Sequence, residues 1–275
     1  MDLGLSGKKV VVSAATRGLG RAIARGFLEE GAEVAICGRK PGGGAEHSTG
    51  RQGPHHPLGT DGVEEALDYL SAFGTVHGRV ADCGYPDQVR DWVEWAADRM
   101  GGLDIAVSNA SALGGIPRTR EGWDISYNVD LLSSVTIFET ALPHMRKAGG
   151  GAFVQTSTIT AIENHAFGEG GFSYGAMKAA LINYVHQLAH EYGSENIRAN
   201  CVCPGPTFVE DGSWAFLKEV LPDYYAENRD RAPSGRFGRP EEIANVVVFL
   251  ASPRASWITG ENITVDGGFT KNVKY

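Results

Sequence analysis

The chain has little positive charge: its 275 residues include 25 Lys and Arg against 33 Asp and Glu, for a formal net charge of −8. General binding to nucleic acid needs a basic surface, so we expect no nucleic-acid partner. No apolar run approaches the roughly 18 residues of a membrane span. The first nine residues also lack the apolar segment of a signal peptide. The sequence therefore predicts a soluble, cytoplasmic protein without a membrane partner.

Cysteine is also scarce, with four residues in the chain. Cys201 and Cys203 are separated by one residue, which is too close for the usual zinc-binding pair, and no second pair follows. We expect buried, reduced thiols. Three histidines lie in a Gly- and Pro-rich stretch, residues 41–62, without an accompanying set of carboxylates or cysteines. A mobile surface loop is the favoured interpretation of 41–62, so we predict no metal site.

Short apolar stretches alternate with amphipathic ones along the whole chain. This alternation predicts the α/β class, with a parallel sheet covered by helices on both faces, in a single domain over residues 1–275. We expect strands at 9–13, 33–37, 76–80, 104–108, 152–157, 197–202 and 262–265, and helices at 18–30, 63–73, 86–99, 125–147, 174–192 and 240–250. Segment 205–239 is rich in aromatic residues. We predict a small lid over a site there, or two short packed helices; the two interpretations are compatible.

The first strand runs into a turn of small residues that leads into a helix. Small side chains let the backbone approach a pyrophosphate, and the start of the helix offers N–H groups and a positive dipole end. A glycine turn alone is a weak signal, because glycine also serves plain turns. Its position after the first strand strengthens the prediction of a dinucleotide site. The turn residues expected at the cofactor are Ser13, Ala15, Thr16, Arg17, Gly18 and Leu19.

No acidic residue follows the second strand, where a carboxylate would bind the adenosine ribose of NAD. Arg39 and Lys40 stand there instead, and Arg17 lies in the turn. Arginine suits bidentate binding of a 2′-phosphate. The sequence therefore favours NADP(H) over NAD(H), with solvated surface arginines as the alternative interpretation.

Tyr174 and Lys178 are four residues apart at the start of a predicted helix, so they share one face. An ammonium group beside a phenol favours the phenolate, and the charge of an oxidised nicotinamide would add to the effect. We therefore expect a lowered pKa for Tyr174, which would exchange a proton with a carbonyl or alcohol oxygen. Without other support, such a pair is mostly an exposed helix pair.

Other support is present in the order of motifs along the chain, which resembles the short-chain dehydrogenase/reductase family, including members similar to 3-oxoacyl-ACP reductases. The resemblance covers nearly the whole chain. The motifs are the turn at 13–20, Asp82 after strand three, Ser108-Asn109-Ala110-Ser111, Thr156-Ser157-Thr158, Tyr174-x-x-x-Lys178, Pro204-Gly205-Pro206-Thr207 and residues 259–268. Their joint occurrence is specific, whereas any one alone would not be.

The resemblance implies a seven-stranded Rossmann-type, doubly wound sheet in a homodimer or homotetramer, with helices 125–147 and 174–192 at the interface. It gives Tyr174 the role of general acid/base. Lys178 would hold the nicotinamide ribose and tune the phenol. The remaining cofactor contacts would come from Asp82, Asn109, Ala110, Pro204, Gly205 and Thr207.

The chain departs from the family pattern at four places. Ala14 replaces a glycine of the turn, and alanine disfavours positive φ. The substrate-orienting serine is matched by Thr158, preferred over Ser157, since a threonine hydroxyl makes the same hydrogen bond. Asp130 stands at the position of the active-site asparagine, where it would pair with Lys178 and oppose ionisation of Tyr174. Finally, the segment 163–172 before Tyr174 is longer than usual.

Taken together, the sequence predicts an NADP(H)-dependent oxidoreductase (EC 1.1.1.-) that transfers hydride between the cofactor and a small-molecule carbonyl or alcohol. The first alternative is a non-catalytic NADP(H)-binding sensor or scaffold. A second alternative is a related enzyme that uses the same tyrosine for epimerisation or dehalogenation. The intact Tyr174–Lys178 pair and the retained cofactor turn favour the oxidoreductase.

Overall fold

A computed structural model gives the structure of the chain, and it describes residues 2–42, 62–112, 118–163 and 172–271. The described residues form a seven-stranded parallel sheet in the order β3-β2-β1-β4-β5-β6-β7. The strands are β1 (Lys9–Val12), β2 (Glu33–Gly38), β3 (Val76–Val80), β4 (Ile105–Ser108), β5 (Gly151–Thr156), β6 (Ile197–Pro204) and β7 (Asn262–Val265). The predicted doubly wound parallel sheet is confirmed.

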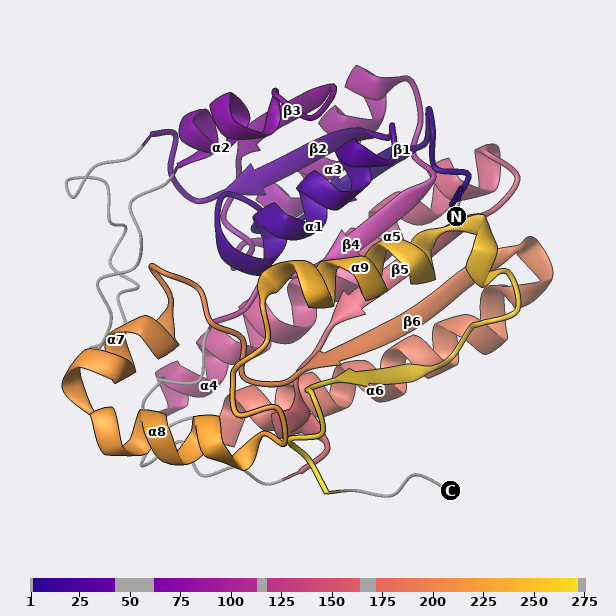
Figure 1. Cartoon of the computed structure of the whole chain (residues 1–275). Coiled ribbons are helices and arrows are strands. Elements are labelled where there is room, and N and C mark those ends of the chain that lie inside the picture. The colour runs from indigo at the N-terminus through magenta and orange to yellow at the C-terminus, as the bar shows by residue number, and fades with distance from the viewer. Residues whose placement is uncertain (1, 43–61, 113–117, 164–171, 272–275) are drawn as a thin grey trace.

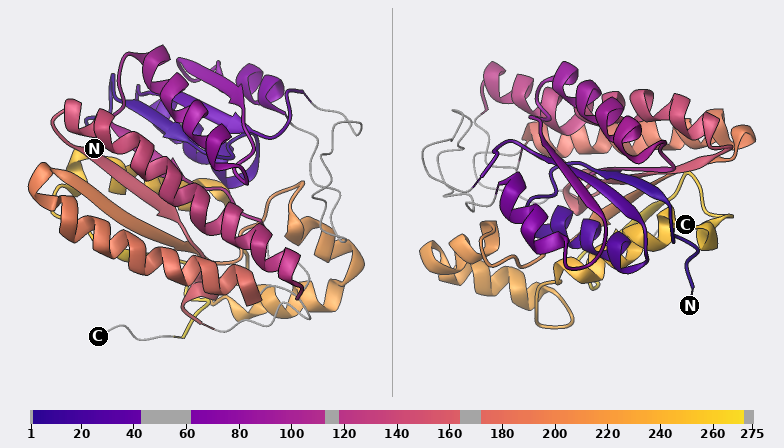
Figure 2. Two further views of the ribbon diagram at one scale, coloured as in Figure 1. Left: turned by 180° about the vertical axis from the view of Figure 1, so that it is seen from behind. Right: turned by 90° about the horizontal axis from the view of Figure 1, so that it is seen from above.

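Helices cover both faces of this sheet, as Figures 1 and 2 show. The helices are α1 (Gly18–Glu29), α2 (Val63–Leu70), α3 (Pro86–Met100), α4 (Arg120–Ser126), α5 (Ser133–Lys147), α6 (Phe172–Tyr192), α7 (Ser213–Val220), α8 (Pro222–Arg231) and α9 (Pro240–Ala251). A π-helical segment, η2 (Tyr127–Leu132), joins α4 to α5. The described residues also contain three 3₁₀ turns, η3 (Ile159–Ala161), η4 (Gly193–Glu195) and η5 (Pro253–Ala255).

Alternate residues of the central strands enter two separate cores. On one face, Val11 and Ala106 pack with α3, α5 and α6, around the fully buried Trp92. On the other face, Val10 and Val12 pack with α1, α2 and α9. Strands buried on both faces explain the continuous apolar runs in the sequence.

Several helix boundaries follow from their terminal residues. Pro86, Pro222 and Pro240 each open a helix, where the missing N–H costs nothing and the fixed φ suits the first turn. Gly101 ends α3 in the left-handed region, at φ 71°. In segment 205–239 the expected pair of short helices is present as α7 and α8.

One predicted helix is wrong in detail. The sequence pattern predicted an uninterrupted helix over 125–147, but the structure has α4, then the π-helical η2, then α5. A π turn closes hydrogen bonds to i+5 and adds a residue to the turn, which changes the face on which later side chains lie. Such segments occur often at functional sites, and η2 carries Asp130.

Strand order reverses between β1 and β4: the chain winds to β2 and β3 on one side and to β4–β7 on the other. In open parallel sheets, ligands bind outside the carboxyl ends of the strands at such a reversal. The ends of β1, β4, β5 and β6 therefore define the place to examine for a site.

Candidate active site

The turn between β1 and α1 is held against the end of β4. The buried Ser13 hydroxyl accepts hydrogen bonds from the backbone N–H groups of Asn109 at 2.9 Å and Ala110 at 3.3 Å. The Asn109 side-chain amide donates in return to the carbonyls of Ser13 at 3.4 Å and Ala14 at 3.3 Å. These bonds fix the turn at the strand reversal.

Ala14 adopts the conformation for which the family pattern has glycine. Its φ is 51°, in the left-handed region that costs an L-residue roughly 1–2 kcal/mol. The turn therefore carries some backbone strain at Ala14.

The start of α1 has the features that a pyrophosphate requires. A Cβ added to Gly20 would lie 2.6 Å from the Asn109 side-chain nitrogen and 2.9 Å from the Ala15 Cα, so the close approach there requires glycine. The N-cap residue Arg17 makes no side-chain capping hydrogen bond to the first N–H groups of α1. These donors and the positive end of the helix dipole fit a phosphate group, so the residues present suit a dinucleotide cofactor.

The adenosine end of such a cofactor would lie beside β2 and β3. Arg39, which is exposed, follows directly after β2, and Asp82 follows β3, its paired neighbour. The carboxylate of Asp82 accepts the Gly84 N–H at 2.8 Å, and its backbone N–H donates to Gln88 at 2.9 Å. Arg39 and Asp82 thus lie at the same end of adjacent strands, as their predicted roles require.

Arg17 is engaged with a different part of the chain. Its guanidinium donates to the Asp211 carbonyl at 3.2 Å and lies 3.7 Å from the Asp211 carboxylate. Val209 also lies against Gly18 of the turn. The segment after β6 therefore contacts the phosphate turn. The sequence did not predict this contact.

Lys178 is buried at the carboxyl ends of β4 and β5. Its ammonium group donates to the carbonyls of Ala110 at 3.0 Å and Thr156 at 3.2 Å, and it lies 3.7 Å from Asp130. Burial lowers the pKa of Lys178, while the charge of Asp130 raises it. The structure thus brings together residues of α6, η2 and two strand ends.

The hydroxyl groups after β5 have different partners. Ser157 donates to the Lys178 carbonyl at 3.1 Å, within the packing of α6. The Thr158 hydroxyl accepts the Thr160 N–H at 3.2 Å, and it also acts to lower the pKa of the Tyr174 phenol. Of the two candidates, Thr158 is the one that lies beside the phenol.

Asp130 is a buried carboxylate that lies beside the Lys178 ammonium group. Its Oδ1 accepts the Ala112 N–H at 3.0 Å, while Oδ2 is buried and has no hydrogen-bond partner among the described residues. Burial raises the pKa of Asp130, and Lys178 and the hydrogen bonds from Ala112 and Ser111 oppose that rise.

The predicted acidity of Tyr174 is not found. Burial and the negative charge of Asp130 raise the pKa of Tyr174 to about 12, although hydrogen bonds from Thr158 and Ser111 act in the opposite direction. The physical reasons are the burial of the phenol, which disfavours the phenolate, and the negative charge of Asp130, which opposes its ionisation. By its own charges, the protein keeps Tyr174 as a neutral phenol.

Ser111 is a member of the site to which sequence reasoning gave no role. Its hydroxyl acts to lower the pKa of both Tyr174 and Asp130. The signal available in the sequence was a polar side chain at the end of the Ser108–Ser111 motif, directly before the backbone that meets Asp130.

The segment after β6 continues from the carboxyl end of that strand. Gly205 donates to the Val265 carbonyl at 3.0 Å, and the Thr207 hydroxyl donates to the Gly205 carbonyl at 3.0 Å. Next along the chain, Trp214, Tyr225 and Phe237 pack their rings against one another, with centroids 4.4–6.5 Å apart. Figure 1 shows α7 and α8 as an appendage beyond the carboxyl edge of the sheet.

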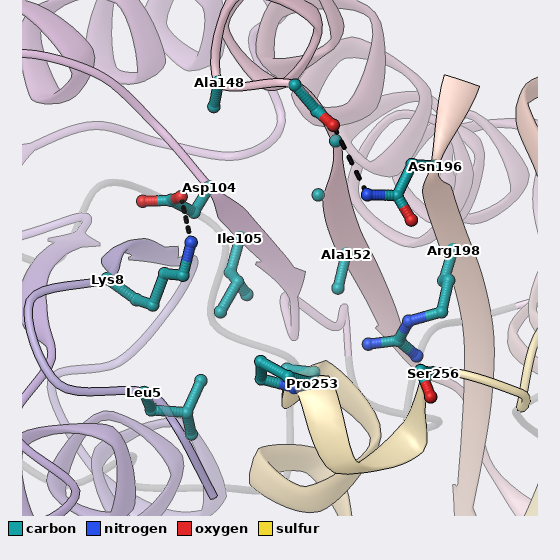
Figure 3. Close-up of a pocket in the computed structure, with 14 residues that line it drawn as sticks. Leu5, Lys8, Asp104, Ile105, Ala148, Ala152, Asn196, Arg198, Pro253 and Ser256 are labelled. Atoms are coloured by element: carbon teal, nitrogen blue, oxygen red, sulfur yellow. Dashed lines mark hydrogen bonds and ion pairs between the residues drawn. The ribbon is translucent and has the colours of Figure 1, made fainter.

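A separate pocket of about 230 Å³ lies at the opposite edge of the sheet, at the starts of β4, β5 and β6 (Figure 3). Its charged groups already have partners. Lys8 pairs with Asp104 at 2.8 Å, and Arg198 donates to the carbonyls of Leu250, Ser252 and Ile258 at 2.7–3.1 Å. The pocket therefore offers no unpaired charge for an ionic ligand.

Among the described residues, no group of three or more His, Cys, Asp or Glu side chains is arranged to hold a metal ion. The four cysteines are buried free thiols, as expected. The histidines of 41–62 lie outside the described residues, as does most of segment 163–172. None of the described helices combines the length and apolar character needed to cross a membrane.

Comparison with known proteins identifies the family. The model of a family described as enoyl-(acyl carrier protein) reductase matches residues 56–270. The isoepoxydon dehydrogenase of Penicillium expansum is 32% identical over 268 residues, covering 98% of this chain and 96% of that protein. The 3-oxoacyl-[acyl-carrier-protein] reductase of Chlamydia pneumoniae is 33% identical over 277 aligned positions, covering 98% and 100%.

Comparison with solved structures gives the same family. An L-sorbose reductase from Gluconobacter frateurii, complexed with NADPH and L-sorbose, superposes with a TM-score of 0.85 at 32% identity, covering 99% of this chain and all of that chain. A short-chain dehydrogenase from Burkholderia cenocepacia in complex with NADP gives 0.79 at 28% identity, covering 96% and 98%. The chain belongs to the short-chain dehydrogenase/reductase family, and it is an oxidoreductase of that family's NAD(P)-dependent class.

Proposed function

We propose that the chain is an NADP(H)-dependent reductase that converts a small-molecule carbonyl to an alcohol, or the reverse, with Tyr174 as general acid/base. The observation that carries the proposal is the meeting of Tyr174, Thr158 and Lys178 at the strand reversal. When bound, the nicotinamide supplies or accepts the hydride. The side chains of this protein would bind the substrate and exchange the proton.

The Thr158 hydroxyl and the Tyr174 phenol would hold the substrate oxygen between them. Tyr174 would donate its proton to that oxygen as the carbonyl carbon is reduced, and take a proton from it in the reverse direction. A phenol whose pKa is raised to about 12 is fully protonated near neutral pH, which suits the donating role. Lys178, fixed by the Ala110 and Thr156 carbonyls, would hold the cofactor ribose beside the phenol.

The cofactor preference is proposed to come from Arg39. It is an exposed cation at the end of β2, with no acidic residue beside it to bind a 2′-hydroxyl. Two relatives that resemble the chain over nearly its full length were solved with NADPH or NADP, which supports the same choice. The proposed cofactor contacts otherwise remain Ser13, Ala15, Thr16, Arg17, Gly18, Leu19, Asp82, Asn109, Ala110, Pro204, Gly205 and Thr207.

The substrate is proposed to enter between the Thr158–Tyr174 pair and a lid formed by 205–239. Trp214, Tyr225 and Phe237 stiffen that segment, and Arg17 ties it to the phosphate turn through Asp211. We also propose that the protein forms a homodimer or homotetramer. Size-exclusion chromatography with light scattering, which gives the molar mass in solution, would test this.

The proposal is tested by mixing purified protein with NADPH and a panel of ketones, ketoses and β-ketothioesters and following NADPH absorbance. We expect turnover of at least one carbonyl and tighter binding of NADPH than of NADH. A non-catalytic sensor would bind NADPH with no turnover of any carbonyl. The raised pKa of Tyr174 is the observation that favours this second function, because a neutral phenol accepts a proton from an alcohol poorly.

A further inference from the structure

An ion pair joins the phosphate turn to the segment after β6. Arg17 is the N-cap residue of α1, so it stands where a phosphate would approach that helix. Its guanidinium lies 3.7 Å from the Asp211 carboxylate, and its Nη1 donates to the Asp211 backbone carbonyl at 3.2 Å. The two side chains are 24% and 35% exposed, so solvent screens the pair only in part. A cation suited to an anionic ligand is therefore already paired with an anion of the protein itself.

Backbone contacts on both sides of Asp211 fix the position of its carboxylate. Val209 lies against the phosphate turn, because a Cβ placed on Gly18 would be 3.6 Å from the Val209 Cγ1. The Gly212 N–H donates to the Val209 carbonyl at 2.9 Å, which closes a turn that has Asp211 as a central residue. Just before this turn, the Phe208 N–H donates to the Gly238 carbonyl at 2.9 Å. The fold thus holds the carboxylate beside Arg17.

A carboxylate this close to an arginine opposes the binding of a phosphate to the same guanidinium. Arginine binds phosphate most strongly through two parallel N–H bonds, and Nη1 of Arg17 is already engaged with Asp211. If the carboxylate stays in place while a phosphate binds, two anions lie side by side and repel each other. If the carboxylate moves away, its ion pair with Arg17 is lost. In both cases Asp211 lowers the affinity of Arg17 for phosphate.

We propose that Asp211 is a specificity-determining residue, whose carboxylate competes with the 2′-phosphate of NADP(H) for Arg17. This inference rests on the proposed function, because it concerns the cofactor that the proposed reaction uses. NADH has no 2′-phosphate, so its affinity does not depend on the competition. Asp211 therefore narrows the preference for NADPH over NADH, from a position 194 residues along the chain from the arginine it pairs with.

The competition has a modest expected size. A phosphate monoester carries about 1.5–2 negative charges near neutral pH, so one neighbouring carboxylate repels it appreciably. Partial exposure of Arg17 and Asp211 reduces the effect, because ion pairs near solvent contribute little. We expect removal of the Asp211 charge to lower the NADPH Kd about three- to tenfold.

A set of variants separates the charge of Asp211 from its other contacts. Asp211→Asn removes the charge and keeps the backbone carbonyl that accepts from Arg17, and Asp211→Glu restores the charge. Arg17→Gln, alone and combined with Asp211→Asn, completes a double-mutant cycle. Glu195→Gln is the matched control. It also removes one negative charge from an ion pair with an arginine, Arg146, but it lies before the start of β6, at the opposite edge of the sheet.

The measurement is the Kd of three probes at one low salt concentration: NADPH and NADH by fluorescence, and adenosine 2′,5′-bisphosphate by calorimetry. Asp211→Asn should tighten NADPH and the bisphosphate about three- to tenfold and change the NADH Kd less than about twofold. Asp211→Glu and Glu195→Gln should resemble the parent for all three probes. In the Arg17→Gln background, Asp211→Asn should change the NADPH Kd less than about twofold, because the contested guanidinium is absent.

The competition is overturned if Asp211→Asn leaves the NADPH Kd unchanged, or if it tightens NADPH and NADH equally. It is also overturned if the tightening persists in the Arg17→Gln background, since the carboxylate would then act without the arginine. Failure of the proposed function looks different, because the parent would then bind NADPH without reducing any carbonyl, or would bind neither cofactor. If Asp211→Asn does not fold, Asp211→Ser removes the same charge and decides.

Discussion

Replacing Arg39 by alanine should weaken NADPH binding and leave NADH binding unchanged. A charge-assisted contact to phosphate contributes about 1.5–3 kcal/mol. Arg39 is exposed at the end of β2, so solvent and salt screen its charge and the lower value applies. About 1.4 kcal/mol corresponds to a tenfold change, so we expect the NADPH Kd to rise about tenfold at low salt.

The assay is a titration of cofactor fluorescence for NADPH and NADH at two salt concentrations, low and high. The difference between parent and Arg39→Ala should shrink at high salt, because exposed charges are screened. Arg146→Ala is the control: this exposed arginine at the end of α5 pairs with Glu195, remote from the proposed site. Equal weakening of NADPH and NADH, or no change in either, would refute the assignment of Arg39 to the 2′-phosphate.

Three further predictions concern the phosphate turn and Tyr174. Gly20→Ala should abolish measurable NADPH binding in a fluorescence titration, because its Cβ would overlap Asn109 and the Ala14 carbonyl. Ala14→Gly should leave the melting temperature within about 2 °C, since relief of the left-handed strain offsets the entropy of glycine. Ala22→Gly in α1, at negative φ, should cost about 1 kcal/mol, and equal losses in both variants would contradict the strain argument. The Tyr174 pKa is raised from 10 to about 12, so its contribution to stability is complete below pH 10 and is lost as pH rises through 12. Denaturant unfolding should show the parent losing about 1.4 kcal/mol more than Tyr174→Phe between pH 9 and pH 11, and parallel losses would contradict the raised pKa.

Much of the fold was predictable because the apolar pattern and the turn-forming residues place the boundaries of the strands and helices at the same positions. The third and last strands have their predicted bounds, Val76–Val80 and Asn262–Val265, and the other strands differ at their ends by one or two residues. Short apolar runs bounded by glycine and polar residues leave little freedom in a parallel sheet that is buried on both faces. The gathering of Tyr174, Lys178 and Thr158 also follows from topology, since all lie at or beyond strand ends on one edge.

Other features depend on contacts that a linear pattern does not encode. The π segment η2 has the composition of an ordinary helix, and its widened turn shows only in the backbone. The pairing of Arg17 with Asp211 joins residues 194 positions apart. The raised pKa of Tyr174 depends on the burial of its phenol and on the nearby carboxylate of Asp130, and neither the burial nor this proximity can be read from the linear pattern.

The most direct test of the central claim is a single-turnover experiment with Tyr174→Phe, in which excess protein is mixed with NADPH and an accepted carbonyl. The account predicts NADPH binding within about twofold of the parent and a hydride-transfer rate that is lower by about two to four orders of magnitude. A variant that consumes NADPH at the parent rate would show that the proton comes from another group, and would contradict the role given to Tyr174.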